Sequence, residues 1–180
     1  MNRKRNPETV RHGSIFVTEF GCGAVLAGDE GVVEVLLPFA GESEEEMAAR
    51  IALLYPKAAT ENRVTREAAL LLRKYFAGGR VTFSVPVDMR GLTKFQSEVY
   101  EAVARIPYGA VRSYGQIAAQ VGRPGAARGV GGAMACNPLP IIIPCHRVVG
   151  ASGALIGYSA PGGVMSKRWL LRMEGAPVPD

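Results

Sequence analysis

Short runs in which hydrophobic residues alternate with glycine or polar residues fill the first part of the chain, and they predict β-strands. The runs Ser14–Phe20, Gly23–Ala27 and Val32–Leu37 are rich in β-branched residues and are broken by glycines. Strands this short, with turns this close together, favour an antiparallel meander. The alternating run Val81–Val87 predicts one more strand.

Two helices are predicted among these strands. Ser43, with Glu46 three residues later, forms a capping box that opens a helix through about Tyr55. Thr65 starts a second stretch with apolar residues at helical spacing, which ends near the glycine pair at 78–79. This half of the chain contains no combination of residues that indicates catalysis.

The second half is predicted to be mainly helical. A capping box at Thr93 opens a helix that reaches about Ile106. Two short helices, 114–120 and 126–136, then flank a glycine-containing turn at 122–125. Such a pair is typical of a helix-turn-helix that binds DNA, although many helical hairpins bind no DNA.

The second short helix is unusual because it is built from small residues. Gly131 and Gly132 each destabilise a helix interior by about 1 kcal/mol relative to alanine. Two explanations stay open: tight packing against a neighbouring helix, or close approach to a DNA groove with Arg128 projecting from the same face.

The remaining segments lead to and from a cysteine. Ile141–Ile143 is predicted to be a buried strand or extended segment that leads into Pro144–Val149. A glycine-rich loop follows over 150–163, and the last helix is predicted over Ser166–Glu174. The chain is therefore predicted to be α+β. An N-terminal α/β domain with a small antiparallel sheet (1–90) has a structural role, and a mainly helical C-terminal domain (91–180) carries the helix-turn-helix-like motif.

Charge separates the two halves. Residues 1–90 carry 12 Lys and Arg against 12 Asp and Glu, whereas residues 91–180 carry 9 against 4. No acidic residue occurs from Ala102 to Met173, a stretch that contains eight cations: Arg105, Arg112, Arg123, Arg128, Arg147, Lys167, Arg168 and Arg172. Such a surface favours a nucleic-acid partner, although a basic face can also serve solubility alone.

Cysteine count and hydropathy exclude several classes of protein. The three cysteines, Cys22, Cys136 and Cys145, form neither a disulfide framework nor a zinc spacing, which indicates a reducing compartment with free thiols. No apolar run has the length of a membrane span, and no apolar region of a secretion signal follows the basic N-terminus. That N-terminus is interpreted as a solvated tail, with weak phosphate contact as the alternative.

Cys145 is the candidate nucleophile. A cysteine reacts as thiolate and needs a base or positive charge nearby, which His146 and Arg147 can supply. Adjacent residues of an extended chain point to opposite faces, so a bridging water is the expected relay between Cys145 and His146. Glu174 opposes the dipole at its helix end and is a candidate partner for His146, which would complete a nucleophile–base–orienter line. An exposed glutamate at a helix end is the alternative.

At these residues the sequence resembles the O6-alkylguanine-DNA alkyltransferases, also called methylated-DNA–protein-cysteine methyltransferases. The resemblance rests on IPCHRVV at 143–149, FQSEVYEAVARIPYGAVRSYGQIAAQVG at 95–122, ARGVGGAMACNPLPIIIPCHRVV at 127–149 and KRWLLRMEG at 167–175. It covers most of residues 92–175. It implies a single-turnover enzyme of DNA repair, which transfers an alkyl group from O6 of guanine, and less readily from O4 of thymine, to its own cysteine after nucleotide flipping.

The resemblance also implies roles for individual residues. Catalysis falls to the acceptor Cys145, its base His146, the orienting Glu174, the hinge residue Asn137, and Tyr114, which helps to rotate the base and bonds its ring nitrogen. The DNA-binding positions are Arg128, which fills the gap in the base stack, and Ser113, Ala126, Ala127 and Gly131. The guanine pocket is implied at Met134, Pro140, Val148, Tyr158 and Ser159, although spacing alone makes Met134 and Tyr158 core residues, as packing also explains Cys136.

The implied partner is double-stranded DNA, contacted through its minor groove, with single-stranded DNA as a further option. No cofactor, metal or membrane is expected, and the protein is expected to be a monomer in the cytoplasm or nucleoid of a prokaryote, or in a nucleus. The zinc ligands of human-type members are missing, no regulatory domain with a cysteine cluster is present, and the loop SAPGGVMS departs from the family pattern.

Three alternatives remain to be weighed. A non-enzymatic lesion sensor has the same DNA-binding half but lacks the acceptor cysteine, which is present here. A cysteine hydrolase would have to release its product, and a basic surround does not suit peptide substrates. A simple DNA-binding regulator would leave the PCHRV segment without a role.

Overall fold

The structure is a computed structural model that describes residues 7–38, 41–58 and 60–177. The first six residues of the basic N-terminus lie outside this range. The chain forms two compact units that meet in sequence between Met89 and Arg90. Within the described residues, no helix is both long and apolar enough to cross a bilayer.

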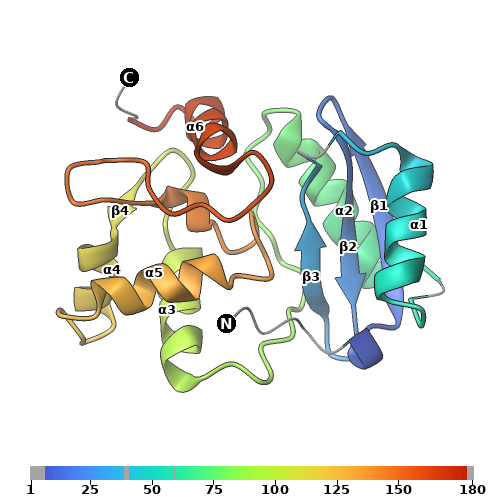
Figure 1. Ribbon diagram of the computed structural model, residues 1–180, viewed down its shortest axis with the longest axis horizontal. Helices are drawn as coiled ribbons and strands as arrows, with labels where there is room; N and C mark the ends of the chain where they lie inside the picture. Colours follow the sequence, from blue (N-terminus) through green and yellow to red (C-terminus); the bar gives the residue numbers. More distant parts are fainter. Residues whose placement is uncertain (1–6, 39–40, 59, 178–180) are drawn as a thin grey trace. The chain divides into compact units, whose positions relative to one another are not determined.

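The N-terminal unit is built on a three-stranded antiparallel sheet (Figure 1). Its strands are β1 (His12–Thr18), β2 (Gly21–Ala27) and β3 (Val32–Leu36), in the order β1-β2-β3. The meander predicted from the alternation is confirmed, with strand ends shifted by at most two residues. The β1–β2 turn is stabilised by the Thr18 hydroxyl, which donates to the Gly21 carbonyl over 3.0 Å.

Helices α1 (Glu44–Leu54) and α2 (Arg63–Phe76) cover opposite faces of this sheet. Met47 and Ile51 of α1 pack with residues such as Ala24 and Leu26 of β2. On the other face, the ring of Phe16 stacks on that of Phe76 with centroids 6.1 Å apart.

The prediction that α2 begins at Thr65 is wrong by two residues. Asn62 is the N-cap, and Thr65 is its partner in the capping box, so the helix starts at Arg63. A threonine at the third position of a helix, whose side chain bonds the backbone of the N-cap residue, is easily mistaken in the sequence for the N-cap itself.

The strand predicted at Val81–Val87 is also wrong. Only Val87 forms an isolated bridge, with Val32, and the neighbouring bonds are Val32 N–H to Pro86 and Asp88 N–H to Val32. Pro86 has no N–H to donate, so a regular ladder cannot continue through this run.

The C-terminal unit is mainly helical. Its helices are α3 (Lys94–Ala104), α4 (Tyr114–Gln120), α5 (Ala127–Ala135) and α6 (Gly163–Met173). The predicted capping box at Thr93 and the cap at Ser113 are both present. Helices α3, α4 and α5 pack on one another, and the Tyr100 hydroxyl of α3 donates to the Ala133 carbonyl of α5 over 2.9 Å.

Two short parallel strands connect distant segments of this unit. β4 (Arg112–Ser113) pairs with β5 (Val148–Val149), with Ser113 opposite Val149. Because β4 directly precedes α4 and β5 directly follows the cysteine turn, the pairing holds the start of α4 beside Cys145.

Two predictions in this unit are wrong. Residues 141–143 form a turn in which Ile141 has a φ of 73°, instead of an extended segment, although Ile141 and Ile143 are buried as expected. Helix α6 begins at Gly163, three residues before the expected start. Its N-cap is Gly162, and Ser166 lies within the first turn, where its hydroxyl donates to the Pro161 carbonyl over 2.7 Å.

Candidate active site

Cys145 begins a short 3-10 helix, Cys145–Arg147, so the chain turns where an extended segment was expected. The residue is only 7% exposed. Burial raises the pKa of its thiol above the ordinary value. A hydrogen bond from Asn137, the positive charge of Lys167 and nearby backbone N–H groups act to lower that pKa. The site thus holds a buried thiol with groups that stabilise its anion.

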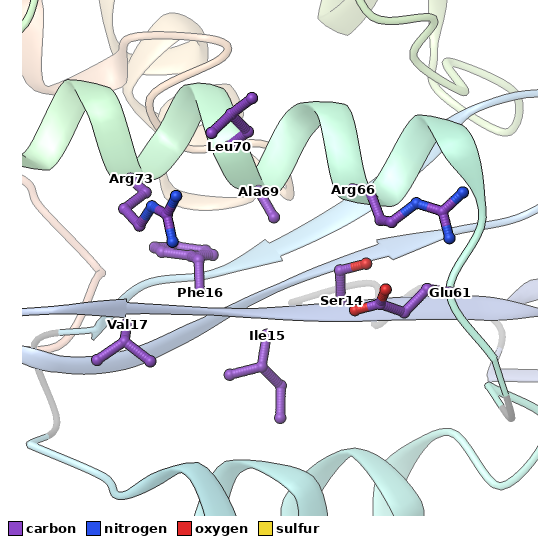
Figure 2. Close-up of a pocket in the computed structure, with 9 residues that line it drawn as sticks. All are labelled: Ser14, Ile15, Phe16, Val17, Glu61, Arg66, Ala69, Leu70 and Arg73. Atoms are coloured by element: carbon purple, nitrogen blue, oxygen red, sulfur yellow. The ribbon is translucent and has the colours of Figure 1, made fainter.

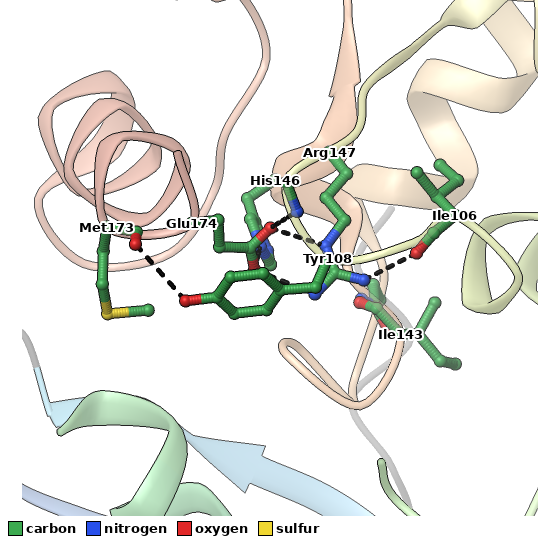
Figure 3. A network of polar contacts seen from close by, with 9 residues as sticks. Ile106, Tyr108, Ile143, His146, Arg147, Met173 and Glu174 are labelled. Carbon is green, nitrogen blue, oxygen red and sulfur yellow. Dashed lines mark hydrogen bonds and ion pairs between the residues drawn. The ribbon is translucent and has the colours of Figure 1, made fainter. Parts of the chain in front are cut away.

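His146 and Glu174 form a fully buried pair (Figure 3). His146 Nε2 lies 2.9 Å from Glu174 Oε1, and both side chains are inaccessible to solvent. Burial lowers the pKa of His146, and the neighbouring glutamate opposes this effect. Because a carboxylate only accepts hydrogen bonds, the neutral imidazole donates from Nε2, and Nδ1 is its proton-accepting nitrogen.

Glu174 is the centre of a larger network. Arg147 donates to it twice, from Nε and Nη2, each over 2.9 Å, and the Gly109 N–H donates over 3.1 Å. Arg147 also donates from Nη1 to the Ile106 carbonyl over 2.6 Å, and the Tyr108 hydroxyl donates to Met173 (Figure 3). The alternative of an exposed helix-end glutamate is wrong, because Glu174 is 4% exposed.

This network corrects the expectation that Arg147 favours the Cys145 anion. The arginine is held by Glu174 and lies with its guanidinium 5.8 Å from the centre of the Tyr108 ring. The cation whose charge acts on the thiol is Lys167.

Lys167 is a component of the site that sequence reasoning counted only as surface charge. It is fully buried, and its Nζ donates to the carbonyls of Val148 over 2.6 Å and Ile156 over 2.8 Å. Burial lowers its pKa to about 8, while the neighbouring Cys145 acts to raise it. Its spacing in the sequence contained the signal, because Lys167 precedes the buried Leu170 and Leu171 by three and four residues, on the inner face of α6.

Asn137 joins the end of α5 to the turn before Cys145. Its Nδ2 donates to the Ile143 carbonyl over 2.8 Å, and its Oδ1 accepts from the Leu139 N–H over 3.0 Å. Both bonds fix the short segment between α5 and Cys145.

The loop 150–162 accepts hydrogen bonds from Tyr114 and contains a second tyrosine, Tyr158. The Tyr114 hydroxyl donates to the carbonyls of Ile156 over 3.0 Å and Gly157 over 3.4 Å. The Tyr158 hydroxyl is buried and has no hydrogen-bond partner among the described residues. Burial, and the proximity of Cys145, raise the pKa of both tyrosines, so both are proton donors at neutral pH.

The other expected pocket residues are placed less uniformly. Ser159 donates from its hydroxyl to the Ala135 carbonyl over 3.1 Å, which ties the loop to α5. Met134 and Val148 are buried as core residues, and Pro140 is half-buried in the turn before the cysteine.

The candidate DNA-binding face combines exposed cations with a helix built mostly from small residues. Arg128 is exposed on α5, Ser113 caps α4, and Ala126 and Ala127 are half-buried at the start of α5. A Cβ added at Gly132 would meet nothing within 4 Å, and one at Gly131 would make only ordinary contact with Tyr114 at 3.9 Å. Tight packing therefore does not explain these two glycines.

Two cations of the acid-free stretch are not on its surface. Arg147 and Lys167 point inward, and those that remain exposed are Arg105, Arg112, Arg123, Arg128 and Arg172. Among the described residues, no group of three His, Cys, Asp or Glu side chains could hold a metal ion.

Residues 94–176 match a family model described as the 6-O-methylguanine DNA methyltransferase, DNA binding domain. The methylated-DNA–protein-cysteine methyltransferase of Mycobacterium bovis is 55% identical over 108 residues, which are 60% of this chain and 64% of that protein. The protein of the same name from Salmonella typhimurium is 53% identical over 104 residues, or 58% of this chain and 60% of that protein. The aligned part thus spans less than two thirds of these relatives.

Solved structures resemble the chain over more of its length. The O6-methylguanine methyltransferase of Mycobacterium tuberculosis superposes with a TM-score of 0.71 and 38% identity, covering 93% of this chain and 94% of that one. Mycobacterium tuberculosis OGT in complex with DNA gives a TM-score of 0.72 at 37% identity, covering 92% and 95%.

Proposed function

This chain belongs to the methylated-DNA–protein-cysteine methyltransferase family, and on that premise we propose that it repairs DNA by taking an alkyl group from O6 of guanine onto Cys145. O4 of thymine is a poorer substrate. The observation that carries the proposal is a buried cysteine in a 3-10 turn beside a buried His146–Glu174 pair. The transfer is irreversible, and each molecule reacts once.

The chemical step is a displacement at the alkyl carbon. A neutral His146 accepts the thiol proton through a bridging water, and Glu174 holds the imidazole in the tautomer that makes this possible. The S–C bond forms as the bond from that carbon to O6 breaks, and the electron pair leaves with the guanine. Lys167 favours the thiolate, because a positive charge in a buried site acts strongly on a nearby anion.

Tyr114 assists the leaving group. Its raised pKa keeps the phenol protonated, so it can donate to a ring nitrogen of the departing guanine. When the flipped base enters, the Tyr114 hydroxyl gives up its hydrogen bonds to the carbonyls of Ile156 and Gly157 and donates to the base instead. Met134, Pro140, Val148, Tyr158 and Ser159 line the base pocket.

The substrate is duplex DNA, entered from the minor groove, with single-stranded DNA as a secondary substrate. Helix α5 approaches the minor groove of the DNA through Ala126, Ala127 and Gly131, and Ser113 contacts the DNA backbone. Arg128 fills the gap that the flipped nucleotide leaves, since extrusion costs a few kcal/mol of lost stacking. The C-terminal unit performs binding and transfer, the N-terminal unit is structural, and the monomer works in the compartment that holds the DNA.

Intact-protein mass after incubation with DNA containing O6-methylguanine tests the proposal. The wild type is expected to gain one methyl group, and Cys145→Ala is expected to gain none while it still binds the DNA. Cys136→Ala is the matched control and is expected to react like the wild type. A Cys145→Ala protein that is methylated at Cys136, or a wild type that binds without gaining mass, contradicts the proposal; the second result is that of a lesion sensor.

A further inference from the structure

The N-terminal unit has an open sheet edge along β1. On one side β1 pairs with β2 over its whole length. On the other side, the described residues provide only the bridge between His12 and Thr60, with the Gly13 N–H donating to the Thr60 carbonyl over 3.2 Å. Backbone groups of a strand alternate between its two sides, so those of Ile15 and Val17 face the same open side as Gly13.

A groove of about 240 Å³ lies along this edge, between β1 and α2. Residues 14–17 of β1 line its floor, and Arg66, Leu70 and Arg73 line it from α2 (Figure 2). Glu61 lies at one end, beside Ser14. The groove therefore combines unpaired strand backbone with side chains from a helix.

The groove is basic along α2. Arg66 and Arg73 are two helical turns apart, so they share one face of α2, and Figure 2 shows both side chains between α2 and β1. Both are exposed, and neither has an acidic partner within the ion pairs of the described residues. Glu61, at the end beside Ser14, is the one carboxylate of the described residues that lines the groove, so two guanidinium groups face a single acidic side chain. This excess of positive charge is complementary to acidic side chains of a ligand.

The edge also lacks the features that usually prevent strand pairing. Proteins protect edge strands with charged residues, prolines or bulges. The run Ser14–Val17 contains none of these, and Val17 and Leu70 leave 53% and 43% of their surfaces exposed. An apolar, uncharged edge with this exposure is suited to pairing with another extended segment.

We propose that this groove binds an extended acidic segment of a partner protein, which adds to the sheet as a strand beside β1. The backbone of the segment pairs with Ile15 and Val17, as in other cases of recognition by strand addition. Arg66 and Arg73 are about 10 Å apart along the helix axis. Side chains on one face of a strand repeat about every 6.6 Å, so acidic residues two or four positions apart meet both arginines.

A second copy of this chain is a poorer occupant. Antiparallel pairing of two β1 edges would place both α2 helices on the same face of the joined sheet. The arginines of the two copies would then face one another, and like charges at close range oppose association.

The test uses the full chain and a fluorescein-labelled decapeptide in which glutamate alternates with valine, followed by fluorescence anisotropy. Saturable binding is expected, and Arg66→Glu/Arg73→Glu is expected to weaken it at least about tenfold, since reversed charges repel the acidic peptide. The matched control, Arg63→Glu/Lys74→Glu, makes the same charge change on exposed positions of α2 outside the groove. It is expected to bind like the wild type.

A second pair of variants tests the backbone pairing. Val17→Pro removes an N–H that faces the open edge, which an edge strand tolerates, and is expected to abolish binding. Val17→Thr keeps the N–H and is expected to retain it. The amide signals of Ile15 and Val17 are expected to shift when the peptide is added.

Four results would overturn the proposal. The first is that the peptide shows no saturable binding, and the second is that a peptide with lysine in place of glutamate binds equally well. The third is that Arg66→Glu/Arg73→Glu loses affinity for an oligonucleotide but not for the peptide. The fourth is that the free protein is a dimer, which Val17→Pro dissociates. The third result would assign the groove to nucleic acid, and the fourth to a second copy of this chain.

Discussion

A buried lysine next to a buried cysteine changes how both side chains ionise. Lys167 has a pKa of about 8 because burial disfavours its charge, and Cys145 has a raised pKa because burial disfavours the thiolate. Each charge stabilises the other, so the reactive anion depends on a residue 22 positions away in the chain. Arg147 is adjacent to the cysteine in sequence, yet Glu174 holds it elsewhere.

Replacing Lys167 with Met is expected to shift the pH dependence of transfer. The unbranched side chain fills similar space without charge, so the pKa of Cys145 rises and less thiolate is present at neutral pH. A shift of one unit slows the reaction at pH 7 about tenfold. The measurement is the rate of reaction with free O6-benzylguanine from pH 6 to 10, with Arg168→Met as the control.

The shape of the profile decides the role of Lys167. If Lys167→Met lowers the rate equally at every pH, the lysine only holds the carbonyls of Val148 and Ile156 and does not act on the thiol. Stability offers a second readout. The folded-state pKa of about 8 lies below the ordinary 10.5, so the unfolded chain binds more protons between these values. The free energy of unfolding of the wild type, relative to Lys167→Met, should therefore rise across that window.

At the scale of elements, the glycines of α5 lower its intrinsic helix stability and leave one surface of the helix without bulky side chains. Gly129 is explained by packing, because a Cβ there would lie 3.2 Å from the Phe95 ring. Gly132 has no such neighbour and is exposed. No contact within the free protein therefore explains a small residue at Gly132. This agrees with the proposal that α5 approaches DNA closely at this position.

Gly132→Ala is expected to raise stability and weaken DNA binding. Alanine favours a helix over glycine by up to about 1 kcal/mol, and the added methyl group meets no atom of the free protein. In the complex it would face the groove. Urea denaturation and a DNA titration measure the two effects. A variant that is more stable and binds DNA as tightly as the wild type would rule out a groove contact at this position.

Arg128→Ala is expected to slow repair of duplex DNA far more than reaction with a free O6-alkylguanine base. Only the duplex has a gap to fill after a nucleotide is flipped. Rates on both substrates are compared with those of Arg105→Ala, another exposed arginine of the same unit. Equal losses on the two substrates would show that Arg128 does not fill the gap.

At the scale of the whole molecule, hydrogen bonds tie the segments around Cys145 to the end of α5. Asn137, just after the end of α5, donates a hydrogen bond to the turn before Cys145. Ser159 of the loop 150–162 donates to Ala135, the last residue of α5. Cys145 itself is nearly inaccessible. Bulk added to its sulfur therefore presses on the segments that position α5.

Alkylated protein is expected to be less stable than free protein and to release DNA more readily. Overfilling a packed site costs about 1–3 kcal/mol, and each kcal/mol lowers the Tm of a chain of this size by about 2–4 °C. A thioether also removes the anion that Lys167 stabilises. Thermal unfolding of free, methylated and benzylated protein measures the effect. Benzyl should lower the Tm more than methyl, and an unchanged or higher Tm after methylation would disprove the idea.

The sequence by itself determined those features that depend on near neighbours. Capping boxes at Ser43 and Thr93 act over three residues, so they were readable before any fold was known, as were the meander and the helix pair 114–136. The segment around Cys145 also identified the nucleophile, because its residues lie side by side in the chain. Where local signals compete, as between Asn62 and Thr65 at the start of α2, the prediction was wrong by a turn or less.

Only the tertiary structure decided which distant side chains meet and which are buried. Glu174 binds both His146 and Arg147, and Lys167 lies inside the site, because β4–β5 pairing and α6 bring together segments that are 19 or more residues apart in the sequence. The left-handed Ile141 depends on the same packing, since a β-branched residue adopts that conformation only when its surroundings impose it. Burial sets the pKa values of the site, and burial is a property of the folded chain alone.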